Sequence, residues 1–108
     1  MDDRIPTYLW VEAEIRRIQS QGLSVYIAHR GDKTGGTVIQ KITNMSGECK
    51  LMGQQRDLLG QLVWINLLQD DIVSEVEADA YIKKSLGRDP DLWVVEIEDK
   101  IMTEQMVF

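Results

Sequence analysis

The sequence has 108 residues, of which 44% are hydrophobic and 28% are charged, and its formal net charge is −6. This length suits one folded domain and not two, and the composition argues against intrinsic disorder, which needs low hydrophobicity together with a high net charge. The 12 basic residues are scattered along the chain. Without a basic stripe, neither nucleic acid nor an anionic membrane surface is expected as a partner.

Cys49 is the single cysteine, so no intrachain disulfide can form, which is typical of a reducing compartment. Asp2 and Asp3 are acidic where a signal peptide would be basic, and no apolar run approaches the ~20 residues of a membrane span. We therefore expect a cytoplasmic protein that forms a single domain over residues 1–108. Cys49 is expected to pack as a small hydrophobic side chain on a strand.

The first predicted element is a helix, with Thr7 as its N-cap and Gly22 just beyond its end. Its apolar side chains recur with helical spacing, at Tyr8, Val11, Ile15 and Ile18. Four strands are expected next, at residues 23–30, 37–43, 48–52 and 61–68. Polar or glycine-containing segments separate them, and residues 53–57 are expected to be a loop.

A second helix is predicted over residues 75–86. Ser74 and Glu77 form a capping box at its start, and Gly87 is expected to end it. The middle of the last strand, residues 92–95, is apolar at every position, so the strand is expected to be buried there on both faces.

The order of helix, four strands, helix, strand and tail predicts an α+β fold. We expect a mainly antiparallel sheet of about five strands, with the two helices on one face of it. In the first strand, the period of two places Val25, Ile27 and His29 on the same face. Residues 100–108 form a C-terminal tail whose packing the pattern does not predict.

Several segments resemble a known family. Arg30-Gly31-Asp32 leaves a strand and leads into a glycine-containing loop, and residues 89–99 combine the last strand with its acidic flanks. Together with Trp10-Val11-Glu12-Ala13 and Arg16-Arg17, they resemble small bacterial proteins, mainly alphaproteobacterial, grouped as domain of unknown function 1491. The resemblance covers nearly the whole chain and implies this fold and a cytoplasmic setting, but no activity. The apolar end of the chain departs from the family's pattern.

His29 is the only histidine and a candidate general base, with Arg30 beside it and Asp32 three residues on. A catalytic triad would also need a positioned nucleophile, which the sequence does not supply. The alternative is a histidine that hydrogen-bonds within the fold. Residues 31–36 raise the possibility of a phosphate cradle, but they lead into a strand and not a helix, so a hairpin loop is the better interpretation.

Carboxylates gather at the end of the last strand. Glu96 and Glu98 share a face, with Cβ atoms roughly 7 Å apart, and Asp99 follows. Such a set suits a hard cation such as Mg²⁺. It equally suits solvated side chains that block unwanted strand pairing. No cofactor is expected.

The tail is more apolar than a frayed terminus should be. We expect it either to add a strand to the sheet or to form an interface with a second copy of the chain or with another protein. The residues concerned are Ile101, Met102, Met106, Val107 and Phe108.

With no complete catalytic set, the sequence favours a non-enzymatic binding or protein-interaction module. The alternative is a small-ligand-binding or hydrolytic enzyme that uses His29, Arg30 and Asp32, or the carboxylates around Glu96 and Glu98.

Overall fold

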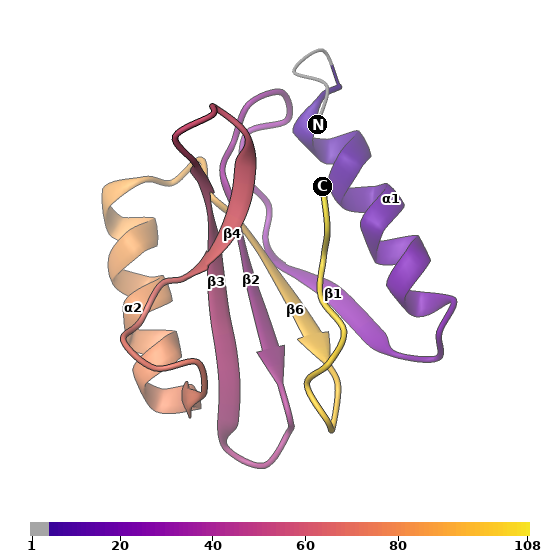
Figure 1. Ribbon diagram of the computed structural model, residues 1–108, viewed down its shortest axis with the longest axis vertical. Helices are drawn as coiled ribbons and strands as arrows, with labels where there is room; N and C mark the ends of the chain where they lie inside the picture. Colours follow the sequence, from indigo (N-terminus) through magenta and orange to yellow (C-terminus); the bar gives the residue numbers. More distant parts are fainter. Residues whose placement is uncertain (1–4) are drawn as a thin grey trace.

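The computed structural model describes residues 5–108. These residues form one mixed β-sheet with two helices packed against it (Figure 1). Its order is β1-β6-β2-β3-β4, and the short β5 pairs with β3 beside β4. All pairs are antiparallel except β2 with β6. The elements are α1 (Thr7–Gln19), β1 (Ser24–His29), β2 (Val38–Thr43), β3 (Glu48–Arg56), β4 (Leu62–Asn66), β5 (Val73–Ser74), α2 (Glu75–Arg88) and β6 (Trp93–Glu98).

The α+β class and the mainly antiparallel sheet are confirmed, with six strands where about five were expected. The additional strand, β5, has only two residues and is too short to leave a periodic signal in the sequence. The expectation that residues 1–4 do not begin a signal peptide concerns residues outside those that the structure describes. Among the residues described, no helix is long and apolar enough to cross a membrane.

The last strand is buried as predicted. β6 lies between β1 and β2, and Trp93, Val94, Val95 and Ile97 are at most 2% exposed. A strand in this position must present apolar side chains on both faces, because both faces are covered by other elements.

The two helices lie on opposite faces of the sheet, so the expectation that they share one face was wrong (Figure 1). Trp93 and Val95 pack in a cluster with Val11 of α1. Cys49 and Leu51 pack on the other face in a separate cluster with Ala78 of α2. The physical reason is that a central strand apolar on both faces needs a cover on each of them.

The helix starts differ from each other. Pro6 is the N-cap of α1 and offers no side-chain hydrogen bond, so the assignment of Thr7 as the cap was wrong by one residue. Ser74 caps α2 as predicted, accepting a hydrogen bond from the Glu77 N–H at 3.1 Å. α2 also continues one residue past Gly87, because glycine only weakens a helix and does not stop it.

β3 runs through residues 53–56, which were expected to form a loop. The glycine that suggested the loop has a packing role: a Cβ atom on Gly53 would lie 2.7 Å from Cδ2 of Leu67. Glycine therefore marks a close approach here and not a break in the strand.

A β-bulge between Ile27 and His29 shifts the register of β1. Ile27 pairs with Val95, but His29 pairs with Val94, which faces the opposite side of the sheet. The expectation that His29 shares a face with Val25 and Ile27 was therefore wrong. One extra residue in a strand reverses the alternation beyond it.

Candidate ligand-binding cavity

Asp32 shapes the segment between β1 and β2, called here the 30–37 loop. Its Oδ2 accepts hydrogen bonds from the Gly35 N–H at 2.9 Å and from the Thr34 hydroxyl and N–H at 3.1 and 3.3 Å. The bonds from Gly35 and Thr34 lower the pKa of the Asp32 carboxyl, because they favour its ionised form. Asp32 therefore holds the loop in one conformation.

The 30–37 loop lies against the entrance to β6. Cβ atoms added at Gly31 or Gly36 would overlap the carbonyl oxygen of Asp91. The Trp93 indole N–H donates to the Asp32 carbonyl at 2.7 Å, and the Asp32 N–H donates to the Asp91 carbonyl at 3.0 Å. The two motifs that carried the family resemblance therefore meet at one packing contact.

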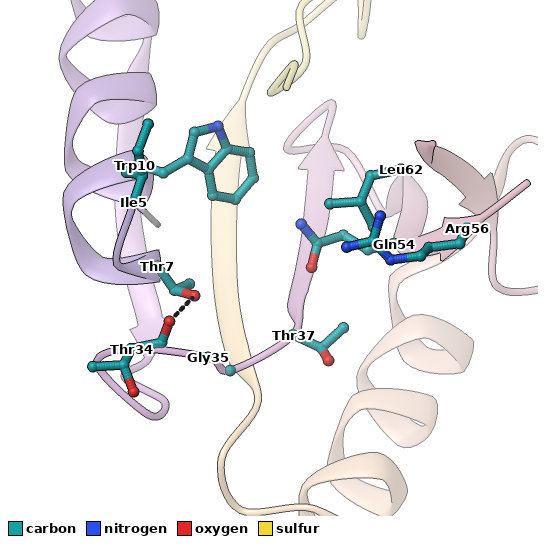
Figure 2. Close-up of a pocket in the computed structure, with 10 residues that line it drawn as sticks. Ile5, Thr7, Trp10, Thr34, Gly35, Thr37, Gln54, Arg56 and Leu62 are labelled. Atoms are coloured by element: carbon teal, nitrogen blue, oxygen red, sulfur yellow. Dashed lines mark hydrogen bonds between the residues drawn. The ribbon is translucent and has the colours of Figure 1, made fainter. Parts of the chain in front are cut away.

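Beside this contact a cavity of about 260 Å³ opens between the start of α1, the 30–37 loop and the adjacent ends of β3 and β4 (Figure 2). The start of α1 is tied to the loop, because the Tyr8 N–H donates to the Lys33 carbonyl at 3.0 Å. The lining residues are Ile5, Thr7, Trp10, Thr34, Gly35, Gly36, Thr37, Gln54, Arg56 and Leu62.

Gln54 presents hydrogen-bond donors to the cavity. Its Oε1 accepts from the Val38 N–H at 2.9 Å, which fixes the orientation of the amide. The amide nitrogen then points into the space opposite Trp10 (Figure 2). Within residues 5–108, this nitrogen and the N–H groups of Gly36 and Thr37 have no hydrogen-bond partner. Among the lining residues described, Arg56 carries the only formal charge, and its Nη1 donates to the Gly60 carbonyl at 2.6 Å.

The apolar wall of the cavity belongs to an aromatic stack. Trp10 is 8% exposed, and its ring centroid lies 6.2 Å from that of Trp64 and 5.8 Å from that of Phe108. Trp64 and Phe108 stack in turn, at 4.9 Å. The three stacked rings come from a helix, a strand and the tail, and together they form an apolar wall.

His29, Arg30 and Asp32 do not line this cavity. His29 is half-buried with Nδ1 2.8 Å from the Leu92 carbonyl oxygen, and the Arg30 guanidinium lies 5.4 Å from the centre of the Trp93 ring. Asp32 is engaged by its own loop. The structure thus gathers the three residues around the entrance to β6, where each makes a contact that holds the fold.

Glu96 belongs to a charged cluster on the α2 face of the sheet. Its carboxylate lies 3.2 Å from Nζ of Lys41, whose side chain is 6% exposed, and it accepts a hydrogen bond from the Tyr26 hydroxyl. Lys41 also pairs with Asp79 at 2.8 Å and with Glu75 at 3.8 Å. Burial alone would lower the pKa of Lys41, but the hydrogen bond to Asp79 and the charge of Glu96 outweigh it, so the pKa is raised. A lysine held protonated in this way is not a base.

Glu98 and Asp99 have different surroundings. Glu98 is half-buried and follows Glu96 on the same face of β6. Asp99 is 5% exposed and accepts hydrogen bonds from the N–H groups of Ile101, Thr103 and Glu104. In the part of the chain that is described, no group of three or more His, Cys, Asp or Glu residues is placed to hold a metal ion.

The tail packs on the core without forming a strand. It runs beside α1 and ends near the start of that helix (Figure 1). Met102 and Met106 are buried within the chain, whereas Ile101 is 74% exposed, Val107 44% and Phe108 37%. Only these last three apolar side chains of the tail remain accessible to a partner.

Sequence reasoning missed the cavity because its polar residues lie in a segment that was expected to be a loop. Once β3 is continued through residues 53–56, the period of two places Gln54 and Arg56 on the same face as Met52. That alternation was the available signal.

The comparisons with known proteins agree on one family. Residues 5–106 match the family model described as "Protein of unknown function (DUF1491)". The chain belongs to this family. It is similar to the crystal structure of a DUF1491 family protein from Caulobacter crescentus CB15, with 33% identity over 89% of each chain and a TM-score of 0.81.

An NMR structure of a DUF1491 family protein from the same organism is 31% identical over 97% of this chain and 98% of that one, with a TM-score of 0.77. Protein Atu0922 from A. tumefaciens shares the fold, with a TM-score of 0.74 and 22% identity over 94% and 97% of the two chains. No match was found among curated proteins. The DUF1491 assignment thus establishes the family and the fold, and it does not specify an activity.

Proposed function

We propose that this DUF1491 protein is a non-enzymatic binding module of the cytoplasm, and that its binding site is the cavity at the start of α1. The observation that carries the proposal is the contrast between two sets of polar groups. The candidate catalytic residues His29, Arg30 and Asp32 are engaged in contacts that hold the fold together. The amide nitrogen of Gln54 points into a cavity and has no partner within residues 5–108.

The dimensions of the cavity also support binding of a small molecule. Ligand sites combine apolar walls with a few fixed polar groups, and volumes begin at about 300 Å³. This cavity, at about 260 Å³, lies just below that range and suits a molecule with one ring. Its apolar side is formed by Trp10, Leu62 and Ile5.

An NMR titration tests this function. We expect benzyl alcohol, benzamide or benzoate, added separately to the ¹⁵N-labelled full chain, to shift the amide signals of Gly36 and Thr37. Leu62→Trp fills the cavity and is expected to abolish the shifts. Val63→Trp is the matched control, because Val63 lies on the other face of the same strand. If none of the three compounds shifts these signals, the proposed function is wrong.

A second candidate function is contact with a second copy of the chain or with another protein. It rests on the exposure of the tail residues Ile101, Val107 and Phe108. Ile101→Ser combined with Val107→Ser keeps the buried methionines in place and is expected to convert a dimer to a monomer in light scattering after size exclusion. A monomeric wild-type chain at high concentration would reject the homodimer.

A further inference from the structure

We propose that this protein pairs with a second copy of itself through the free edge of β4, which adds the β4 strand of the second copy antiparallel to its own. The two sheets then continue into one. This interface is separate from the cavity, so the inference goes beyond the proposed binding of a small molecule. It is carried by the direction of the β4 backbone groups and by the absence of any protection along this edge.

The pairing of β4 with β3 shows which backbone groups of β4 point outward. The Asp57 N–H donates to the Gln61 carbonyl at 2.8 Å, and the Leu67 N–H donates to the Leu51 carbonyl at 2.9 Å. These two bonds lie at opposite ends of one register, and hydrogen-bonded positions alternate along an antiparallel pair. The odd-numbered residues of β4 therefore bond to β3. The even-numbered residues direct their N–H and carbonyl groups away from it, and these are Leu62, Trp64 and Asn66.

β4 lies at the end of the sheet, and within residues 5–108 its outward N–H groups have no acceptor. A free row of backbone groups is a template for another strand, which natural proteins block with charges, prolines or bulges. β4 has no charged residue, no proline and no break in its register with β3. At the opposite edge, β1 carries the bulge between Ile27 and His29. β4 is therefore the edge that is open to an added strand.

The side chains of β4 supply apolar surface for the same contact. Leu62 and Trp64 lie on one face of the strand, and Val63 and Ile65 lie on the other. All four are only half-buried. Neighbouring strands lie about 4.8 Å apart, so an added strand covers side chains on both faces at once. Burial of this surface then stabilises the pairing beyond its backbone hydrogen bonds.

The partner that fits this edge is a second copy of the chain. A two-fold axis at Trp64, the middle residue of β4, sets Trp64 opposite its own counterpart and Leu62 opposite Asn66 of the second copy. The outward groups of both strands then meet in register, and each such pair of residues exchanges two hydrogen bonds.

The distribution of charge also favours a second copy at this edge. The whole chain has a net charge of −6, which opposes close approach of two copies, but β4 itself is uncharged. Strand pairing therefore sets no like charges directly opposite each other. The same axis brings the exposed Leu58 and Leu59 at the hairpin tip of one copy toward Leu67 and Leu68 of the other, which are half-buried.

Light scattering and amide hydrogen exchange on the full wild-type chain test the inference. We expect the mass to approach that of two chains as the concentration rises. In the dimer, the Leu62, Trp64 and Asn66 amides should exchange at least tenfold more slowly than in the diluted monomer, because they gain acceptors. The Val63 and Ile65 amides, already bonded to β3, should change less than twofold.

Two outcomes of these measurements would overturn the inference. A chain that stays monomeric at every concentration would exclude the second copy and leave the edge to another protein. A dimer in which the Leu62, Trp64 and Asn66 amides gain no protection would show that the two copies meet elsewhere.

Substitutions give an independent test. Val63→Lys sets a charge opposite Ile65 of the second copy and should weaken dimerisation at least tenfold. Ala28→Lys places the same residue at an exposed position on β1 and should weaken it less than twofold. Equal effects of the two lysines would overturn the inference. If Val63→Lys does not fold, the exchange pattern of the wild-type chain still decides.

The tail variant, in which Ile101→Ser is combined with Val107→Ser, separates this interface from the one formed by the tail. A dimer paired through β4 survives the double substitution, because neither residue lies near β4 in the sheet order. A monomeric tail variant would place the interface on the tail and overturn the pairing of β4.

Discussion

The side chain of Gln40 pairs with the backbone of Met106 across 66 residues of sequence. The amide nitrogen of Gln40 donates to the Met106 carbonyl at 3.3 Å, and its amide oxygen accepts from the Met106 N–H at 2.7 Å. Both residues are fully buried. The Gln40 amide thus provides hydrogen-bond partners for the Met106 N–H and carbonyl, as a neighbouring strand would in a sheet.

Gln40→Leu should therefore destabilise the protein by about 3 kcal/mol, because the Met106 N–H and carbonyl would stay buried without a partner. Urea denaturation measures this change, and hydrogen exchange of the Met106 amide should accelerate. Gln55→Leu removes an exposed glutamine and should change stability by less than about 0.5 kcal/mol. Equal effects of the two substitutions would mean that the tail is not held by Gln40.

Lys41 is expected to contribute more to stability than Lys50, which also forms an ion pair. Lys41→Met leaves three carboxylates without their cation and should cost about 2 kcal/mol, less than for a wholly buried pair because Asp79 is largely exposed. Lys50→Met breaks one exposed pair with Asp71 at 3.9 Å and should cost under about 1 kcal/mol. Thermal and urea unfolding measure both changes, and a neutral Lys41→Met would contradict the structural role.

The Tyr26 phenol should ionise at a higher pH than an ordinary tyrosine. Its hydrogen bond to Glu96, together with burial, raises the pKa of the Tyr26 phenol to about 12 from 10.0. Because the folded-state pKa is the higher one, the stabilisation is complete below pH 10 and is lost between about pH 10 and 12. A titration of absorbance at 295 nm should show a phase near pH 12 that is absent in Tyr26→Phe. The phase should persist in Tyr81→Phe, and its persistence in Tyr26→Phe would contradict the assignment.

Asp99 should make the tail sensitive to acid. Burial would raise the pKa of its carboxyl, but hydrogen bonds from the Glu104, Thr103 and Ile101 N–H groups outweigh burial, so the pKa lies below 3.8. The stabilisation is present above pH 3.8 and is lost as the pH falls through the folded-state value.

Asp99→Ala should cost about 2 kcal/mol at pH 7, with the difference from wild type shrinking below pH 3.8. Unfolding in urea at both pH values measures this. Asp70→Ala, at an exposed position, is the control for removing a carboxylate. A cost that does not depend on pH would show that the charge of Asp99 is not what holds the tail.

Substitution by alanine should change the stability of the protein in opposite directions at two glycines, Gly31 and Gly87. Gly31→Ala places a Cβ atom against the carbonyl of Asp91, so the 30–37 loop must move away from β6 at a cost of about 3 kcal/mol. A Cβ atom at Gly87 meets nothing within 4 Å, and alanine there should stabilise α2 by up to about 1 kcal/mol. Differential scanning calorimetry separates the two, and a tolerated Gly31→Ala would mean that the loop does not pack as closely as described.

The sequence predicted the elements that leave strong local signals. The continuous apolar run from Leu92 to Val95 predicted a buried strand, and these four residues are at most 7% exposed. The side chain of Ser74 predicted the start of α2. These signals are local because burial on both faces and capping depend on side chains adjacent in the sequence.

Glycine misled the prediction where it served long-range packing. Gly53 makes room for Leu67, and this contact was not visible in the residues around either position. The same holds for the bulge that turns His29 to the other face of β1, since a bulge is defined by the partner strand. Both errors arise because the same local residue pattern is compatible with a turn, a bulge or a close approach of two segments.

The sequence by itself determined the class of fold, the family and the buried last strand, because hydrophobic periodicity and short motifs act through neighbours in the chain. Only the tertiary structure decided that the helices take opposite faces, that the tail is held by Gln40, and that Gln54 and the 30–37 loop border a cavity. These features join residues far apart in sequence, and their hydrogen bonds and contacts exist only once the sheet has formed.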